Sequence, residues 1–210
     1  MTHIFPREFH QKMLARRVWK GFPALKRAFD VAAAATGIFF SLWLMGIIAL
    51  LILLEDGAPV LFRQTRVGKG EKPFTLYKFR SMRKDAPNVA SRDLKNPEQY
   101  LLKTGKILRK TSLDELPQLF NILRGEMSVV GPRPLIPAEE KIHLLRRQYG
   151  VYDVRPGVTG WAQVNGRDKL PLKHKAMLDK FYVDHRGIYL DLRILKRTVF
   201  YVFERRGIEH

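Results

Sequence analysis

The 210-residue sequence contains no cysteine, and this absence excludes disulfide bonds, thiolate metal sites and a cysteine nucleophile. Acidic residues are scarce too, because 20 aspartates and glutamates stand against 38 lysines and arginines, for a formal charge of +18. So basic a chain favours a polyanionic partner: nucleic acid, an anionic lipid surface or a phosphorylated small molecule. Its length fits one domain plus an anchor.

Charged residues and proline are both missing from residues 31–54, a run of 24 mostly apolar residues. As a helix, this run would be roughly 36 Å long, which exceeds the hydrocarbon core of a bilayer at about 30 Å. It is too long, begins too late and lacks the small-residue cleavage site of a signal peptide. The pattern predicts a membrane helix, with a buried core helix as the alternative.

Both flanks of the apolar run are basic, with seven lysines and arginines in residues 1–30 and eight in residues 55–84. Basic flanks stay in the cytoplasm, so the pattern predicts a re-entrant helix that bends and returns to the side it entered. Irregular backbone at membrane depth is tolerated when its polar groups find internal partners. Small and hydroxyl residues are the candidate bending points, namely Thr36, Gly37, Ser41 and Gly46.

The rest of the chain predicts a mainly α fold with one short β-hairpin. Two β-prone runs, residues 59–64 and 73–79, flank a turn-rich basic stretch. Helices are predicted over residues 100–110, 139–149, 172–183 and 189–204. The last of these is basic and amphipathic, which suits either a membrane interface or an ordinary core. A loop is predicted over residues 84–98 and a proline-stiffened arm over residues 131–137. A glycine-rich loop is predicted over residues 155–167.

Two adjacent carboxylates, Asp114 and Glu115, stand out in this basic chain. Pro117 is acceptable in a first helical turn and Gly125 suits a helix end, so the pair is expected at or just inside a helix N-terminus. A capping box from Ser112 to Glu115 is the structural alternative. Carboxylates among arginines at such a position suit phosphate chemistry, in which one attacks phosphorus and the other helps hold a divalent cation.

Several basic or polar residues are candidate phosphate ligands. Arg133 is held between two prolines, and rigid placement of a guanidinium suits bidentate phosphate binding. A structural salt bridge is the alternative for Arg133, and a solvent-exposed position is the alternative for Lys78 and Arg80. The remaining candidates lie upstream of the carboxylates, at the end of the second β-prone run or around the glycine-rich loop: Arg109, Lys78, Arg80, Arg155, Asn165 and Arg167.

Four motifs resemble the bacterial sugar transferase family, the small monotopic polyprenyl-phosphate phosphoglycosyl transferases. They occur in order along the chain and are long and ungapped: LKRAFD (25–30), YKFRSMR (77–83), TSLDELPQLFNILRGEMSVVGPRP (111–134) and RPGVTGWAQVNGR (155–167). The resemblance extends from about Leu25 to about Val202. One departure concerns the membrane helix, where the family usually has a Ser-Pro pair but Ser41 is followed here by Leu42.

The resemblance implies transfer of a phospho-sugar from a nucleotide diphospho-sugar, usually a UDP-sugar, to polyprenyl phosphate. It implies Asp114 as the nucleophile of a phospho-aspartyl intermediate, Glu115 as its partner, and Mg²⁺ held by these two residues. It also implies a bacterial inner-membrane protein: residues 1–58 form the basic segment and re-entrant helix, and residues 59–210 form a cytoplasmic catalytic domain on the membrane. Anionic lipids are expected partners and nucleic acid is not.

Two alternatives remain at this stage. A non-enzymatic, membrane-tethered basic adaptor that binds anionic lipid or nucleic acid explains the charge and the apolar run. It does not explain a carboxylate pair among ordered arginine motifs. A phosphohydrolase of nucleotide sugars would use the same site with water as the acceptor. The sequence leaves open the sugar, the base, the glycan pathway and the oligomeric state, with a homodimer in the membrane as one alternative.

Overall fold

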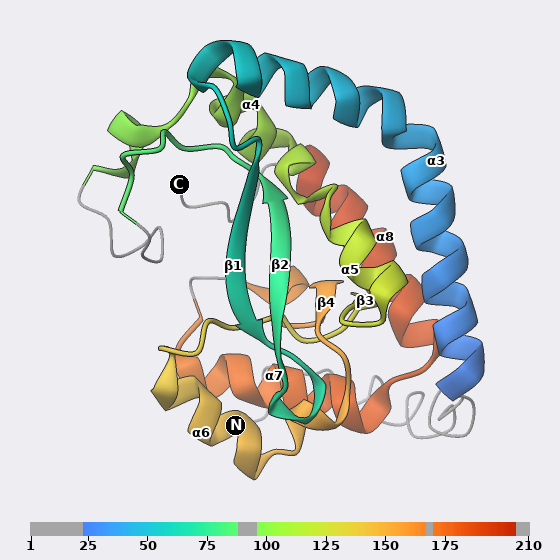
Figure 1. Ribbon diagram of the computed structural model, residues 1–210. Coiled ribbons are helices and arrows are strands. Elements are labelled where there is room, and N and C mark those ends of the chain that lie inside the picture. The colour runs from blue at the N-terminus through green and yellow to red at the C-terminus, as the bar shows by residue number, and fades with distance from the viewer. Residues whose placement is uncertain (1–22, 88–95, 167–169, 205–210) are drawn as a thin grey trace.

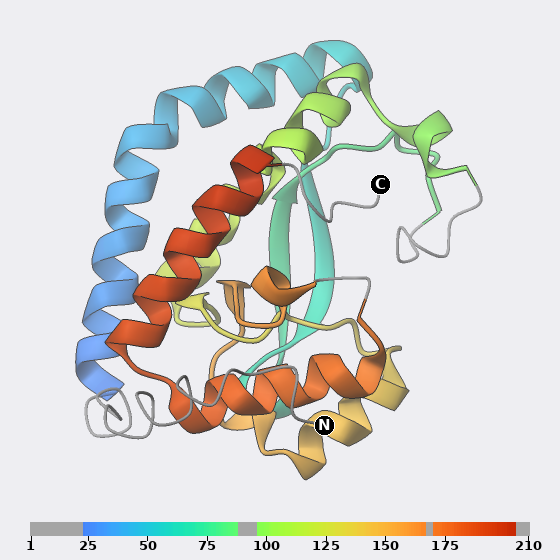
Figure 2. The same ribbon diagram turned by 180° about the vertical axis from the view of Figure 1, so that it is seen from behind.

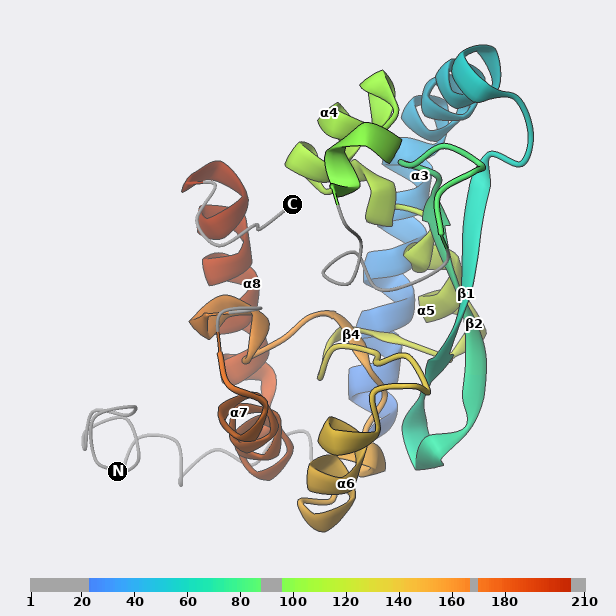
Figure 3. The same cartoon turned by 90° about the vertical axis from the view of Figure 1, so that its left-hand side faces the viewer.

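The protein, described by a computed structural model over residues 23–87, 96–166 and 170–204, is mainly helical with a small antiparallel hairpin (Figure 1). The predicted fold class is confirmed at this level. Seen from the side, the hairpin and the C-terminal helices lie on opposite sides of the molecule, with α5 and β4 between them (Figure 3). The helices are α3 (Pro23–Asp56), α4 (Lys103–Thr111), α5 (Gln118–Arg124), α6 (Glu140–Gln148), α7 (Leu172–His185) and α8 (Ile188–Glu204).

Helix α3 contains the predicted apolar run and is the one helix in the described residues that is long and apolar enough to cross a membrane. It is bent, so that its two halves run in different directions (Figure 1). Near its middle the Ser41 hydroxyl donates a 2.6 Å hydrogen bond to the Gly37 carbonyl. Hydroxyl bonds of this kind, back to the preceding turn, bend helices. Ser41 therefore supplies a cause for the bend without proline.

The outer surface of α3 is strongly apolar. Phe39 is 76% exposed and Trp43 is 67% exposed, and Leu54 near the end of the helix is 75% exposed. The inner surface packs on the rest of the fold, with Ala34 in one buried cluster and Ile52 in another. Exposed apolar surface of this extent marks an interaction with a membrane or a partner.

The hairpin pairs β1 (Leu61–Val67) with β2 (Pro73–Phe79), which confirms the prediction. Directly opposed residues share a face of the sheet, and the register pairs Gln64 with Leu76. Alternation then places Arg66 and Lys78 on the same face as Leu76, which is buried in the core. One face of the hairpin thus combines a core contact with two cationic side chains.

The glycine-rich motif forms part of a second, parallel sheet, in which β3 (Ser128–Val130) pairs with β4 (Gly157–Thr159). A Cβ atom on Gly157 would lie 2.1 Å from the backbone nitrogen of Gly131, so only glycine fits there. Strands of three residues are too short to leave a periodic pattern, and the sequence did not predict them.

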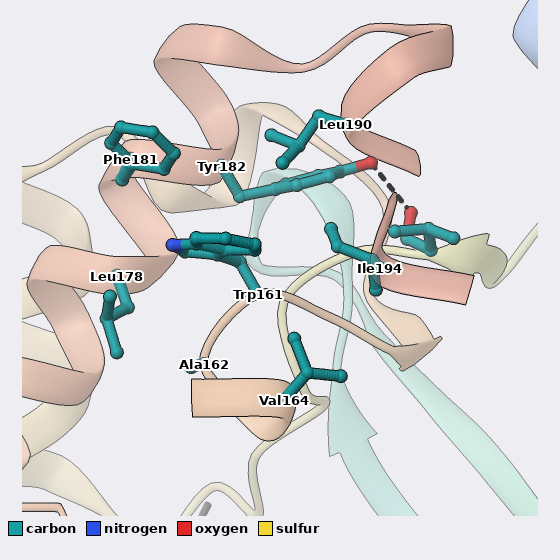
Figure 4. Packing of buried hydrophobic residues seen from close by; sticks show 9 residues of the cluster. Trp161, Ala162, Val164, Leu178, Phe181, Tyr182, Leu190 and Ile194 are labelled. Atoms are coloured by element: carbon teal, nitrogen blue, oxygen red, sulfur yellow. Dashed lines mark hydrogen bonds between the residues drawn. The ribbon is translucent and has the colours of Figure 1, made fainter. Parts of the chain in front are cut away.

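The main core lies between this sheet and the two C-terminal helices (Figure 4). Trp161 stacks on Phe181, with their ring centroids 5.7 Å apart. The Tyr182 hydroxyl donates a 2.9 Å hydrogen bond to the Val130 carbonyl, which joins α7 to β3. From behind, the first turns of α8 and α3 lie side by side (Figure 2), where Lys26 and Asp191 form a 3.0 Å ion pair.

Helix α8 turns part of its apolar surface to the core, including the partly buried Leu195, and leaves part of it exposed. Its core contacts are Leu190 and Ile194, whereas Leu192 and Val199 are each more than half exposed. Helix α5 buries Gln118, Asn121 and Ile122, whereas Phe120 and Leu123 are each 38% exposed. Periodicity correctly identified the helices, but it did not identify the side on which each one is buried.

Candidate active site

The carboxylate pair lies on a separate 3-10 turn, Leu113–Glu115, between α4 and α5. The predicted helix start is therefore a 3-10 turn, and Leu116 and Pro117 keep helical backbone angles up to α5, which begins at Gln118. The capping box is absent. Ser112 has a left-handed backbone (φ 57°) and no side-chain cap bond, whereas an N-cap residue needs extended geometry. Ser112 ends α4 and turns the chain so that both carboxylates face the hairpin.

Lys78 bridges the two carboxylates. Its ammonium nitrogen lies 2.7 Å from a Glu115 oxygen and 3.6 Å from an Asp114 oxygen. Asp114 is buried, and burial is the main cause that raises its pKa. The charge of neighbouring Glu115 also raises the pKa of Asp114, whereas the charges of Lys78 and Arg109 lower it. The net direction is upward, so Asp114 is a carboxylate whose charge is poorly solvated and depends on nearby cations.

Arg109 approaches Asp114 because α4 packs unusually close to the end of β2. A Cβ atom on Gly105 would lie 2.0 Å from the Ser81 carbonyl oxygen, so glycine is needed at this contact. The Arg109 Nε donates a 3.0 Å hydrogen bond to the Ser81 hydroxyl. Burial lowers the pKa of Arg109, and the nearby Asp114 charge raises it. The structure therefore brings the predicted Arg109 to the carboxylate pair.

A small pocket that is partly open to solvent lies beside the pair. Glu115 and Lys78 line it, and Asp114 adjoins it through its contact with Lys78. Of the predicted ligands, Arg133 also reaches this pocket. The lining is completed by Arg66, Leu76, Gln118, Pro134, Gly157 and Val158.

The proline-stiffened arm that carries Arg133 is held in place from two sides. Arg146 donates a 2.8 Å hydrogen bond to the Arg133 carbonyl and is itself paired with buried Asp179 at 2.6 Å. From the hairpin, Arg66 donates a 3.0 Å bond to the Pro134 carbonyl. These bonds fix the backbone on both sides of the Arg133 side chain. Within the described residues, the guanidinium of Arg133 itself makes no hydrogen bond or ion pair.

Arg80 lies elsewhere. It is 6% exposed, pairs with the Asp56 carboxylate at 3.0 Å and donates to the Gly57 carbonyl at 2.7 Å. These contacts fasten the end of α3 to the end of β2. Arg80 is not among the residues that line the pocket.

Two predicted ligands of the glycine-rich loop, Arg155 and Asn165, are not among the residues that line the pocket. Arg155 donates a 2.7 Å bond to the Gly125 carbonyl, at the C-terminal end of α5, where a cation is favoured. Asn165 donates to the Trp161 carbonyl and accepts from Arg197 of α8, both at 2.7 Å. Arg167 lies outside the described residues.

Two polar pocket residues were missed by the sequence reasoning, Arg66 and Gln118. Arg66 is half-buried; burial lowers its pKa to about 10, with the like charge of Arg133 acting in the same direction. Strand alternation could have identified Arg66. It lies two positions after Gln64, which pairs with the buried Leu76, so it shares the face of Leu76. Gln118 lies three positions after Glu115, and helical spacing would have predicted that the two side chains are neighbours.

The pair can hold a divalent cation only with help from the substrate. The described residues contain no group of three or more histidines, aspartates or glutamates that could hold a metal ion. Mg²⁺ is usually bound by one or two carboxylates together with substrate phosphates and water. Asp114 and Glu115 already converge on one cationic group, the Lys78 ammonium. The donor set therefore fits a Mg²⁺ ion shared with a phosphate ligand.

A fold that joins a long apolar helix to a basic pocket and a carboxylate pair defines a membrane-associated enzyme acting on phosphates. The chain belongs to the bacterial sugar transferase family, whose model matches residues 22–205. It is an enzyme of the phosphoglycosyl transferase class, and its family is membrane associated.

Known relatives resemble the chain over most of its length. It is 43% identical to the uncharacterized sugar transferase EpsL of Bacillus subtilis over 88% of the chain and 90% of the relative. It is also 43% identical to the UDP-glucose:undecaprenyl-phosphate glucose-1-phosphate transferase of Caulobacter vibrioides, over 83% of the chain and 68% of the relative. The Escherichia coli transferase of the same name is 39% identical over 87% of the chain, which spans 41% of that larger relative.

Proposed function

We propose that the protein transfers a phospho-sugar from a UDP-sugar to undecaprenyl phosphate, releasing uridine monophosphate (UMP), through a covalent intermediate on Asp114. The observation that carries this proposal is the buried Asp114, held with Glu115 and Lys78 beside a pocket that two arginines line. The names of the relatives in Caulobacter vibrioides and Escherichia coli support the choice of donor and acceptor.

In the first displacement, an Asp114 carboxylate oxygen forms a bond to the phosphorus that carries the sugar. The bond from that phosphorus to the bridging oxygen breaks, and its electron pair leaves with UMP, so no proton is required. Lys78 and Arg109 keep the Asp114 carboxylate ionised and oriented. Asp114 or Glu115, together with substrate phosphate oxygens, would hold a Mg²⁺ ion, which would supply positive charge during the displacement.

In the second displacement, a phosphate oxygen of the lipid attacks the same phosphorus and the Asp114 carboxylate leaves. Direct attack of one phosphate anion on another is opposed by charge, and the covalent intermediate divides it into two steps at one site. The surrounding cations screen both anions in turn.

The membrane placement rests on the bent helix. Both flanks of α3 are basic, and the bend of the helix allows it to enter and leave on the cytoplasmic side. Residues 1–58 then form the anchor and residues 59–210 a cytoplasmic catalytic domain on anionic lipid. The exposed apolar surface of α3 and the exposed Leu192 and Val199 of α8 suit this contact.

Product identity tests the proposal. Purified enzyme is given undecaprenyl phosphate, Mg²⁺ and a panel of UDP-sugars, and both the lipid and the nucleotide products are identified. The proposal predicts undecaprenyl diphosphate-sugar and UMP in equal amounts, with turnover lost on chelation of Mg²⁺. Free sugar phosphate would indicate a phosphohydrolase, and no reaction with any UDP-sugar would favour a non-catalytic adaptor.

A further inference from the structure

One face of the hairpin carries cationic groups at both ends of the pocket. Lys78 stands opposite Phe62 and Arg66 stands opposite Phe74, so both project from the same face. Phe62, the partner of Lys78, is four residues from Arg66 along β1, so the two cationic residues are separated by roughly 13 Å along the strand direction. The pocket that both residues line therefore has one end at the carboxylate pair and the other near Arg66 and Arg133.

Two guanidinium groups lie at the Arg66 end of the pocket, and the charges of Glu139 and Glu115 offset part of their positive charge. The guanidinium groups of Arg66 and Arg133 lie close enough for their charges to repel. The Nε atom of Arg66 is buried and has no hydrogen-bond partner in the described part of the chain. Buried, incompletely paired cationic groups cost free energy. An arrangement of this kind is favourable once an anion with several oxygens binds between the two groups.

Gln118 adds a neutral donor to the same pocket. It is the first residue of α5, three positions after Glu115, and only 3% of its surface is exposed. Within the described residues its side-chain amide makes no hydrogen bond, although it lines the pocket. Its amide atoms are not among the fully buried polar atoms, so they are open to the pocket, where a ligand oxygen can accept a hydrogen bond from the amide nitrogen.

We propose that Arg66, together with Arg133 and Gln118, binds the nucleotide-side phosphate of the donor and so holds the leaving group. The inference rests on the proposed function. Phosphoryl transfer places the attacking and leaving oxygens roughly in line on opposite sides of phosphorus. With Asp114 at one end of the pocket, the leaving phosphate points to the end at which Arg66 and Arg133 lie.

The charges agree with this assignment. When the bridging bond breaks, negative charge accumulates on UMP, and guanidinium groups bind such oxygens in a bidentate manner. Lys78 is already engaged by the two carboxylates. Arg66 donates only to neutral oxygens, those of the Pro134 carbonyl and the Gln64 side chain, and Arg133 forms no ion pair within the described residues. Their charges are therefore not neutralised by an ion pair and are available to the departing nucleotide.

The test measures UMP binding to the full-length enzyme in lipid nanodiscs by isothermal titration calorimetry. Arg66→Gln removes the charge but leaves a side-chain donor for the Pro134 carbonyl. Arg63→Gln is the matched control, because Arg63 lies exposed on the opposite face of the same strand. We expect Arg66→Gln to weaken UMP binding by about 10- to 100-fold, and the control to leave it within about twofold.

Equal UMP affinity in wild type and Arg66→Gln, or an equal loss in Arg63→Gln, overturns the assignment. Thermal unfolding shows whether each variant is folded. If Arg66→Gln is not, Arg66→Lys takes its place: it is expected to lose about threefold or more in affinity because lysine lacks the planar fork, and unchanged affinity would overturn the assignment. If wild type neither binds UMP nor forms a sugar-phosphate adduct, the proposed function itself fails.

A double-mutant cycle separates direct binding from positioning of the arm. If Arg66 only positions Arg133 through the Pro134 carbonyl, Arg66→Gln has no further effect on UMP affinity in an Arg133→Ala background. If Arg66 contacts the phosphate, the double variant binds UMP at least about fivefold more weakly than Arg133→Ala alone. The inference predicts the second result, and the first would reduce Arg66 to a structural residue.

Discussion

The ammonium group of Lys78 lies 2.7 Å from the carboxylate of Glu115, and it reaches Asp114 at 3.6 Å on its other side. One cation from the hairpin therefore serves two carboxylates from the turn between α4 and α5. Adjacent carboxylates repel each other when both are ionised. Lys78 opposes this repulsion and ties the acidic pair to the strand that lines the pocket.

Lys78→Met should shift the pH dependence of catalysis. Lys78 lowers the pKa of Asp114, so its removal raises that pKa further. We expect the acid limb of the kcat/KM profile to move to higher pH, with activity reduced by about tenfold or more at neutral pH. Lys72→Met, at an exposed residue of the hairpin turn, is the control. An acid limb that stays in place would show that Lys78 does not set the ionisation of the nucleophile.

Asp114→Asn should stabilise the fold while abolishing activity. The pKa of Asp114 is raised in the folded protein, chiefly by burial. The stability linked to this group is complete below its unfolded-state pKa and is lost as the pH rises through the folded-state pKa. The amide avoids this loss, so the variant should unfold on the order of 2 °C higher at neutral pH, with the difference vanishing in acid. Exposed Asp85→Asn should change nothing, and a lower unfolding temperature for Asp114→Asn would contradict the account.

Asp179→Ala should be severely destabilising. Asp179 and Arg146 form a buried pair at 2.6 Å, and truncating one partner leaves an uncompensated buried charge. We expect a loss of about 3–5 kcal/mol in the free energy of unfolding by denaturant. Asp184→Ala breaks the exposed pair with Lys180 on the same helix and should cost about 1 kcal/mol or less. Similar losses in the two variants would mean that burial does not matter at Asp179.

Long periodic segments were predictable from sequence, and contacts between distant segments were not. The apolar run predicted α3 and the β-prone runs predicted the hairpin, because the pattern that indicates each element lies within its own segment of the sequence. The turn that carries Asp114 was assigned to a helix start, because nothing local showed that Ser112 adopts a left-handed backbone.

The candidate ligands divided in the same way. Lys78, Arg109 and Arg133 come together at the site or its pocket, whereas Arg80 and Arg155 hold backbone carbonyls elsewhere. An arginine beside a glycine or proline looks the same in sequence whether it binds a ligand or a carbonyl. Only the packing of segments remote in the chain distinguishes the two.

The two flanks of α3 should be on the same side of the membrane. The chain has no cysteine, so single cysteines at His10 and Gly70 report topology without a background. Both should resist a membrane-impermeant thiol reagent in intact cells and react after lysis. Labelling of one position from outside would show that α3 spans the membrane and would refute the re-entrant arrangement.

The covalent step is tested most directly by intact-protein mass spectrometry after wild-type enzyme, Mg²⁺ and a UDP-sugar are mixed without lipid. Wild type should gain the mass of one sugar phosphate and lose it when undecaprenyl phosphate is added. Asp114→Asn is nearly isosteric but a poor nucleophile, so it should gain nothing, while Glu115→Gln should form only traces of adduct. A sugar-phosphate increment that persists on Asp114→Asn, or unchanged turnover in that variant, would contradict the assignment of Asp114 as the nucleophile.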